Sequence, residues 1–189
     1  MLIGDKAIFA IESGVKDYYK RPSFLACGFF LIHILGRRYG VHSPDATMLA
    51  CSYGEVERRL AGRGYHTAPF SKETNGGAIA DAFRDAIYAP GQTGKKFFDL
   101  SQEDFTAVIY GNHLMWAPDG DEAFDDGSYI IQFDVENSVR LIGFNDVEAG
   151  YHHDPDTLRD ISMDADAFYK ILQNWRDAFD QERVSTSKQ

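Results

Sequence analysis

Cysteine is scarce in this chain of 189 residues, where only Cys27 and Cys51 are present. Both lie in apolar runs, where buried thiols are common. Two cysteines without a secretory leader do not make the disulfide framework of a small secreted protein. The first residues, Met1 to Lys6, also lack the basic-then-apolar order of a signal peptide. We therefore expect a cytoplasmic protein.

The chain also lacks a hydrophobic run that could cross a bilayer. The longest candidate, Phe24 to Leu35, is interrupted by Gly28 and His33. It is shorter than the roughly 20 apolar residues that a transmembrane helix needs. A composition of 44% hydrophobic and 14% aromatic residues nevertheless excludes disorder as the main state. We expect a globular protein with no membrane partner.

Lysine and arginine are scarce in the second half of the chain. Residues 1–98 contain 13 Lys and Arg against 9 Asp and Glu, whereas residues 99–189 contain 6 against 20. The two halves therefore carry +4 and −14, which add up to the net charge of −10. Such an acidic half disfavours nucleic acid and favours a basic protein partner. Acidic surfaces also simply keep proteins soluble, so charge alone does not define a site.

A β-hairpin is predicted in the acidic half. The runs Ser128–Val135 and Val139–Phe144 are rich in β-branched and aromatic residues, and a short polar turn joins them. With a period of two, one face of the first strand is apolar and is expected to be the single buried face: Tyr129, Ile131 and Phe133. The opposite face is polar and is expected to meet solvent: Gln132 and Asp134.

Other segments follow the usual patterns of strands, helices and their caps. Further strands are predicted at Ala7–Glu12, Phe24–Leu35 and Ala46–Cys51, with Ser13–Ser23 and Gly36–Gly40 as loops and turns. Helices are predicted from Ser52, from Asn75 to Tyr88, over Gln102–Tyr110 with Ser101 as its cap, and after Ser162 or Asp164. The last helix has an apolar stripe that is expected to face the core: Phe168, Ile171, Leu172, Trp175 and Phe179. This order predicts an α+β fold with a mostly antiparallel sheet packed against three to four helices, the C-terminal helix included. We expect a single domain over residues 1–183 and a disordered tail at 184–189.

Ser52 permits two interpretations. It lies in Ala50-Cys-Ser-Tyr-Gly54, a small-x-Ser-x-Gly pattern between an expected strand and an expected helix, as in the nucleophile elbow of serine hydrolases. Acidic residues and the pair His152 and His153 follow in the order that such a triad requires. The same serine, with Glu55 three residues later, also forms a capping box at a helix start. A small serine hydrolase therefore stays open as an alternative.

Metal-binding patterns are incomplete. His152, His153, Asp154 and Asp156 are ligand types, but adjacent histidines in extended chain point apart. The segment from Asp119 to Gly127 is similar to a calcium loop, yet an alanine stands where a third ligand belongs and no glutamate occupies the twelfth position. We expect no metal, no cofactor and no catalytic constellation.

The N-terminus carries a family resemblance. Met1-Leu-Ile-Gly-Asp-Lys-Ala-Ile-Phe-Ala-Ile-Glu12 resembles the opening of immunity protein family 42, in which a Gly-Asp turn precedes a Phe-Ala-Ile-Glu strand. These proteins accompany the polymorphic toxins of bacteria. The resemblance implies a non-catalytic cytoplasmic antitoxin that binds a cognate toxin domain. It supplies no site residues, since Gly4, Asp5, Phe9 and Ile11 match as turn and core positions.

The binding surface must therefore be predicted from the acidic half. Five acids occur within eight residues before the hairpin, further acids follow it, and two aromatic residues flank these loops as possible anchors. The predicted partner-binding residues are Trp116, Asp119, Asp121, Glu122, Asp125, Asp126, Glu148, Tyr151, Asp154 and Asp156. The expected partner is a basic toxin domain, for which a nuclease is one candidate. The other alternative is an acidic regulatory module that binds some other basic protein.

Overall fold

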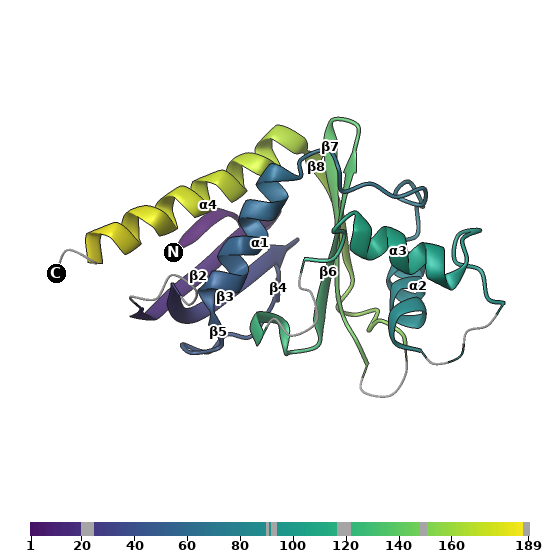
Figure 1. Cartoon of the computed structure of the whole chain (residues 1–189), viewed down its shortest axis with the longest axis horizontal. Helices are drawn as coiled ribbons and strands as arrows, with labels where there is room; N and C mark the ends of the chain where they lie inside the picture. The colour runs from purple at the N-terminus through teal and green to yellow at the C-terminus, as the bar shows by residue number, and fades with distance from the viewer. Residues whose placement is uncertain (20–24, 90, 92–93, 117–121, 148–150, 187–189) are drawn as a thin grey trace.

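The computed structural model describes residues 1–19, 25–89, 91, 94–116, 122–147 and 151–186 (Figure 1). Within them the strands are β1 (Leu2–Asp5), β2 (Phe9–Tyr18), β3 (Ala26–Ile34), β4 (Arg37–Tyr39), β5 (Thr47–Met48), β6 (Ser128–Val135), β7 (Ser138–Asn145) and β8 (Arg159–Asp164). The helices are α1 (Leu49–Ala61), α2 (Gly76–Tyr88), α3 (Gln102–Gly111), the short 3-10 helix η1 (Glu122–Phe124) and α4 (Ala165–Thr186).

The strands form two antiparallel sheets. The first has the order β1-β2-β3-β4, with β5 also paired to β3, and the second has the order β6-β7-β8. All the strand pairs within these sheets are antiparallel. The predicted α+β class with a C-terminal helix is confirmed, although the strands are divided between two sheets.

Helices α1 and α4 cover one face of the first sheet (Figure 1). The apolar stripe predicted on the C-terminal helix is confirmed, because Phe168, Leu172, Trp175 and Phe179 are all fully buried. These side chains pack against residues of β2 and β3 in one hydrophobic cluster. The Trp175 indole also donates a hydrogen bond to the Ser13 hydroxyl at 3.0 Å.

Helices α2 and α3 lie against the second sheet, on the side away from α4 (Figure 1). A second hydrophobic cluster joins Phe83 of α2 and Phe105 of α3 to Ile131 and Phe133 of β6. This is the buried hairpin face that the alternation predicts. The hairpin strands were also predicted well, as β6 and β7 pair from Ser128↔Asn145 to Val135↔Ser138.

The opposite hairpin face is not exposed to solvent, and this expectation was wrong. Gln132 is fully buried, and Ile130, Val139 and Leu141 belong to the cluster beneath α4. The hairpin therefore lies between the two hydrophobic clusters. The sequence does not reveal the burial of Gln132, because the residues that hydrogen-bond its side chain come from distant segments.

The first sheet extends further than predicted. Strand β2 continues through Ser13 to Tyr18, where a loop was expected, and β4 occupies the expected turn after Leu35. Polar residues are accommodated here because they find partners in the core. Ser13 accepts the Trp175 bond, and the buried Tyr39 hydroxyl lies 2.7 Å and 3.0 Å from the carbonyl oxygens of Thr157 and Gly143.

The helix caps were predicted with mixed success. The Asn75 side chain accepts a bond from Ala78 N at 3.1 Å, and Ser101 accepts one from Asp104 N at 3.1 Å, as predicted. Asp164 similarly accepts from Ala167 N at the start of α4. The predicted Ser52 cap was wrong, because α1 begins at Leu49 with Met48 in the cap position and no side-chain cap.

The two cysteines differ in their exposure. Cys27 is buried in β3, whereas Cys51, expected in a strand, is exposed on α1. In the described part of the chain, no helix combines the length and apolar character that spanning a membrane requires.

Candidate functional site

Two acidic segments meet at one end of the β6–β7 hairpin. One segment, from Glu122 to Asp126, leads into β6, and the other, around Asp154, follows β7. Asn145 at the end of β7 contacts both. Its side-chain amide donates to the Asp126 carbonyl at 3.2 Å, and its own carbonyl accepts from Asp154 N at 2.8 Å. Residues far apart in sequence thus form one acidic end, which comprises Glu122, Asp125, Asp126, Asp154 and Asp156.

The carboxylates of this acidic end have two different roles. Asp126 accepts hydrogen bonds from Gly40 N at 3.1 Å, from Ser128 N at 3.2 Å and from the Ser128 hydroxyl at 2.5 Å. Asp154 accepts from Asp156 N at 3.0 Å and so closes a turn. These two side chains shape the loops. Glu122, Asp125 and Asp156 are exposed and present their charge to solvent, and Asp126 is exposed as well although its carboxylate is hydrogen-bonded.

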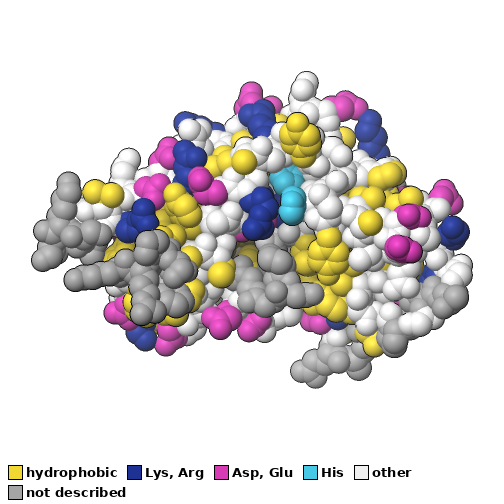
Figure 2. Space-filling model, in the orientation of Figure 1, with side chains coloured by type: hydrophobic (Ala, Val, Ile, Leu, Met, Phe, Trp, Pro, Cys, Tyr) yellow, Lys and Arg dark blue, Asp and Glu magenta, His cyan; other side chains and the backbone are white. Residues whose placement is uncertain are grey.

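The acidic end contributes to a visibly charged border of the molecule. Figure 2 shows acidic side chains along the lower edge of this face, in the region where Figure 1 places η1. Opposite charges are interspersed over the part of this face that α1 and α4 form (Figure 2). The acidic border is therefore a local feature and does not extend uniformly over the face.

The other predicted site residues have different locations. Trp116 is only 1% exposed, and its indole donates to Gln132 Oε1 at 3.1 Å, so it belongs to the core and not to the surface. Tyr151 is 39% exposed and is available as an aromatic contact. Three predicted residues lie outside the described residues: Asp119, Asp121 and Glu148.

The histidine pair beside the acidic end holds its loop to α2. His153 Nδ1 lies 2.7 Å from Asp81 Oδ1, and His152 Nδ1 lies 3.7 Å from the same oxygen. The His153 amide also donates to this oxygen at 3.0 Å. Among the residues that the structure describes, no group of three or more His, Cys, Asp or Glu side chains is arranged to hold a metal ion. The pair has a structural role here.

Ser52 lies within the first turns of α1 and not on a strand-to-helix turn. Its side chain is 1% exposed, and its buried Oγ has no hydrogen-bond partner in the described chain. A substrate cannot reach a hydroxyl in this position without rearrangement of the helix. The geometry that a nucleophile elbow requires is therefore not formed at Ser52.

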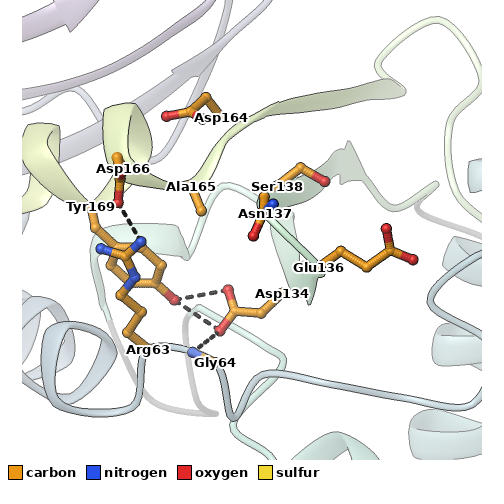
Figure 3. A pocket seen from close by; sticks show the side chains of 10 residues that line it. All are labelled: Arg63, Gly64, Asp134, Glu136, Asn137, Ser138, Asp164, Ala165, Asp166 and Tyr169. Carbon is orange, nitrogen blue, oxygen red and sulfur yellow. Dashed lines mark hydrogen bonds and ion pairs between the residues drawn. The ribbon is translucent and has the colours of Figure 1, made fainter.

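A hollow of about 390 Å³ lies at the other end of the hairpin (Figure 3). It is lined by the segment that follows α1, the β6–β7 turn and the start of α4, and we refer to it as the turn-end hollow. Its lining residues are Arg63, Gly64, Asp134, Glu136, Asn137, Ser138, Asp164, Ala165, Asp166 and Tyr169. Sequence reasoning missed this site, because it joins three distant segments that each resemble ordinary polar surface.

Hydrogen bonds fix the floor of the turn-end hollow. The Tyr169 hydroxyl donates to the Asp134 carboxylate, at 2.8 Å from Oδ1, and Gly64 N donates to Oδ2 at 2.6 Å. The Arg63 guanidinium lies over the Tyr169 ring, 5.1 Å from its centroid, and pairs with Asp166 at 2.5 Å (Figure 3). Burial and the neighbouring Asp134 charge raise the pKa of Tyr169, so its hydroxyl remains a donor at neutral pH.

A buried polar network continues beneath this floor. Gln132 donates to the Tyr169 hydroxyl at 3.0 Å and accepts from Arg59 Nη1 at 3.0 Å. Arg59 is fully buried, pairs with Glu55 at 2.8 Å and donates to the Met115 carbonyl at 2.6 Å. Burial lowers the pKa of Arg59 to about 10, which leaves the guanidinium charged at neutral pH. The network connects the core to the hollow through hydrogen-bonded side chains.

The fold has a counterpart of known structure. The chain matches the crystal structure of CdiI from Burkholderia dolosa AUO158 with a TM-score of 0.56 and 17% sequence identity. The match covers 92% of this chain and 97% of that chain. At this identity the similarity establishes a shared fold. No curated protein sequence matches the chain.

The sequence then identifies the family. Residues 1–178 match the family model for Immunity protein 42, and the chain belongs to this family. The resemblance noted in the first twelve residues is therefore confirmed over almost the whole chain. An immunity role follows from membership of this family.

Proposed function

We propose that this immunity protein acts in the cytoplasm by binding a cognate toxin domain directly, and that it neutralises the toxin without catalysing a reaction. The observation that carries this proposal is the junction at Asn145, which holds the two acidic segments side by side. Family membership supports the immunity role. The acidic end supplies a surface on which a basic partner can bind.

Charge defines the chemistry of the proposed partner. Residues 99–189 carry 20 acidic and 6 basic side chains, so the field around the acidic end attracts a positively charged surface. A nuclease domain is one such partner, since it holds phosphates with basic residues. Carboxylates placed on those residues would block access of the substrate. The proposed direct contacts are the exposed Glu122, Asp125, Tyr151 and Asp156.

The remaining predicted residues have a different status in this proposal. Asp119, Asp121 and Glu148 belong to the same acidic stretches of the sequence, and we include them as proposed contacts. Asp126 and Asp154 are proposed to act indirectly, because their carboxylates hold the backbone of the loops. Trp116 is removed from the proposed surface by its burial.

Co-expression with the product of the adjacent upstream gene, as the candidate toxin, tests the proposal. We expect the chain to restore growth and to co-purify with the toxin in a complex that weakens as salt is raised. The triple variant Glu122→Lys, Asp125→Lys and Asp156→Lys should lose most of its affinity. Glu103→Lys, which reverses an exposed charge on α3, serves as the matched control and should protect like the wild type.

The same experiment separates the alternatives. An acidic regulatory module would bind a basic protein yet would not restore growth in the presence of the toxin. A hydrolase acting through Ser52 would lose ester turnover on Ser52→Ala substitution, an activity that the burial of Ser52 argues against. Full affinity of the triple variant would remove the acidic end from the proposal, whereas absence of any complex would refute direct binding.

A further inference from the structure

The turn-end hollow is separated from the acidic end by the length of the hairpin. Ser128 pairs with Asn145 at the acidic end, and Val135 pairs with Ser138 beside the hollow. Strands of eight residues span about 25 Å at roughly 3.3 Å per residue. A single side chain of a partner cannot contact both ends. The hollow is therefore a distinct surface and not an extension of the acidic end.

An exposed aromatic residue follows two of the lining residues in the chain. Tyr65 is 76% exposed, the highest value among the large hydrophobic side chains that the structure describes, and Arg63 and Gly64 before it line the hollow. Tyrosine and arginine are enriched among the residues that dominate protein–protein affinity. An aromatic ring that is left in water, directly after two lining residues in the chain, is the kind of anchor that such interfaces use.

The lining also determines which partner chemistry fits. Four carboxylates (Asp134, Glu136, Asp164 and Asp166) and the single guanidinium of Arg63 line the hollow, and Lys72 pairs with Glu136 at 2.6 Å from outside the lining. The lining together with Lys72 therefore carries two more negative than positive charges. The volume of the hollow, about 390 Å³, is within the range of pockets that hold ligands. A lysine or arginine side chain meets complementary charge here, whereas an acidic side chain would be repelled.

The hollow is organised before a partner arrives. Asp134 and Tyr169 are held by the bond between them, and Gln132 supports Tyr169 from the buried network. Arg63 is held over the Tyr169 ring by its pair with Asp166. Binding at a surface of this kind orders few side chains, which reduces the entropic cost of association.

We propose that the turn-end hollow is a second contact surface for the toxin, and that it receives a lysine- or arginine-bearing segment with the Tyr65 ring packed beside it. This inference rests on the proposed function, since the toxin domain is the partner in both. It adds a surface that is independent of the acidic end. The acidic end and the turn-end hollow would then contact the toxin at opposite ends of the hairpin.

Titration calorimetry with the purified toxin domain from the adjacent upstream gene tests the inference. Tyr65→Ala and the double variant Glu136→Lys with Asp166→Lys should each raise the Kd about tenfold or more. Tyr110→Ala, at an exposed tyrosine of α3, and Glu103→Lys are matched controls and should stay within about twofold of the wild type. Circular dichroism and thermal unfolding establish that each variant is folded.

The outcomes distinguish the inference from the proposed function. Weakened binding by the hollow variants supports the inference, whether or not the acidic-end variants also weaken it. If both hollow variants bind like the wild type while the acidic-end variants bind poorly, the inference is overturned and the proposed function stands. If the wild-type chain does not bind this toxin domain at all, both are overturned.

Discussion

The guanidinium of Arg59 lies 4.5 Å from the centroid of the Trp116 ring, at the junction of the two sheets. It is fully buried and is balanced by Glu55 on its own helix. Its other bonds reach Met115 and Gln132, which belong to different segments. A buried charge in this position connects α1 to the hairpin.

Removal of the Arg59 side chain should therefore destabilise the protein strongly. Arg59→Ala leaves the buried Glu55 carboxylate with only the half-exposed Arg58 as an ion-pair partner, and we expect a loss of about 3–5 kcal/mol in the free energy of unfolding, measured by urea denaturation. Arg58→Ala removes the more exposed partner of the same carboxylate and should cost less than about 1 kcal/mol. The double variant Arg59→Met with Glu55→Gln should be more stable than Arg59→Ala. If the double variant were no more stable than Arg59→Ala, the explanation by an uncompensated buried charge would be contradicted.

Asp126 should contribute more to stability than its neighbour Asp125. Its carboxylate accepts bonds from Gly40 N, Ser128 N and the Ser128 hydroxyl, so Asp126→Ala leaves partly buried donors unpaired. We expect a loss of about 1–3 kcal/mol on thermal or chemical unfolding. Asp125→Ala, at an exposed side chain, should change stability by less than about 0.5 kcal/mol. Similar values for both would show that the Asp126 bonds are unimportant.

The turn between β3 and β4 offers a stabilising substitution. Leu35 and Gly36 form a two-residue turn with positive φ angles of 49° and 79°, and Leu35 is 42% exposed. Asparagine tolerates this conformation far better than leucine, so Leu35→Asn should raise the free energy of unfolding by about 1 kcal/mol. Leu2→Asn, at an exposed leucine in a strand, is the control and should give no gain. A decrease for Leu35→Asn would instead assign the leucine a packing role.

Stability should fall with mild acid because of two buried histidines. Burial lowers the pKa of His33, and burial together with the Arg59 charge lowers that of His66, both from the ordinary value of 6.5. The unfolded chain then binds more protons, so stability is fully present above pH 6.5 and declines as the pH falls below it. Urea midpoints between pH 7.5 and 5.5 should show this decline.

A variant of His66 isolates its share of the pH effect. Its Nδ1 donates to the Asn112 carbonyl at 3.0 Å, and an asparagine amide can supply a similar donor. His66→Asn should therefore reduce the slope of stability against pH over the same range, even if its stability at pH 7.5 is lower. An unchanged slope would show that His66 does not titrate differently in the folded and unfolded states.

Local signals in the sequence predicted those parts of the structure that local interactions determine. Asn75 and Ser101 cap their helices because a side-chain oxygen needs only an amide three residues away. The hairpin was likewise recognisable from its two runs and the turn between them. Ser52 was misassigned because a capping pattern and a buried helical serine look the same in sequence, whereas α1 begins at Leu49, which is buried in the first hydrophobic cluster.

Long-range partners determine what the sequence did not reveal. The sequence predicts that Gln132 faces solvent, yet its side-chain amide is hydrogen-bonded to Arg59, Trp116 and Tyr169 inside the core. The acids of each loop were visible, but nothing local indicated that Asn145 holds the two loops together. The turn-end hollow was missed for the same reason.

The hairpin is covered on both faces, and this has a consequence for how the molecule opens. An amide in the middle of β6 or β7 can exchange with solvent only after both hydrophobic clusters have separated from it. We therefore expect these amides to be the slowest to exchange, and a cavity in either cluster to speed exchange in the same strands. A substitution that destabilises one hydrophobic cluster would then also destabilise the other, so that the two clusters unfold in a single cooperative event.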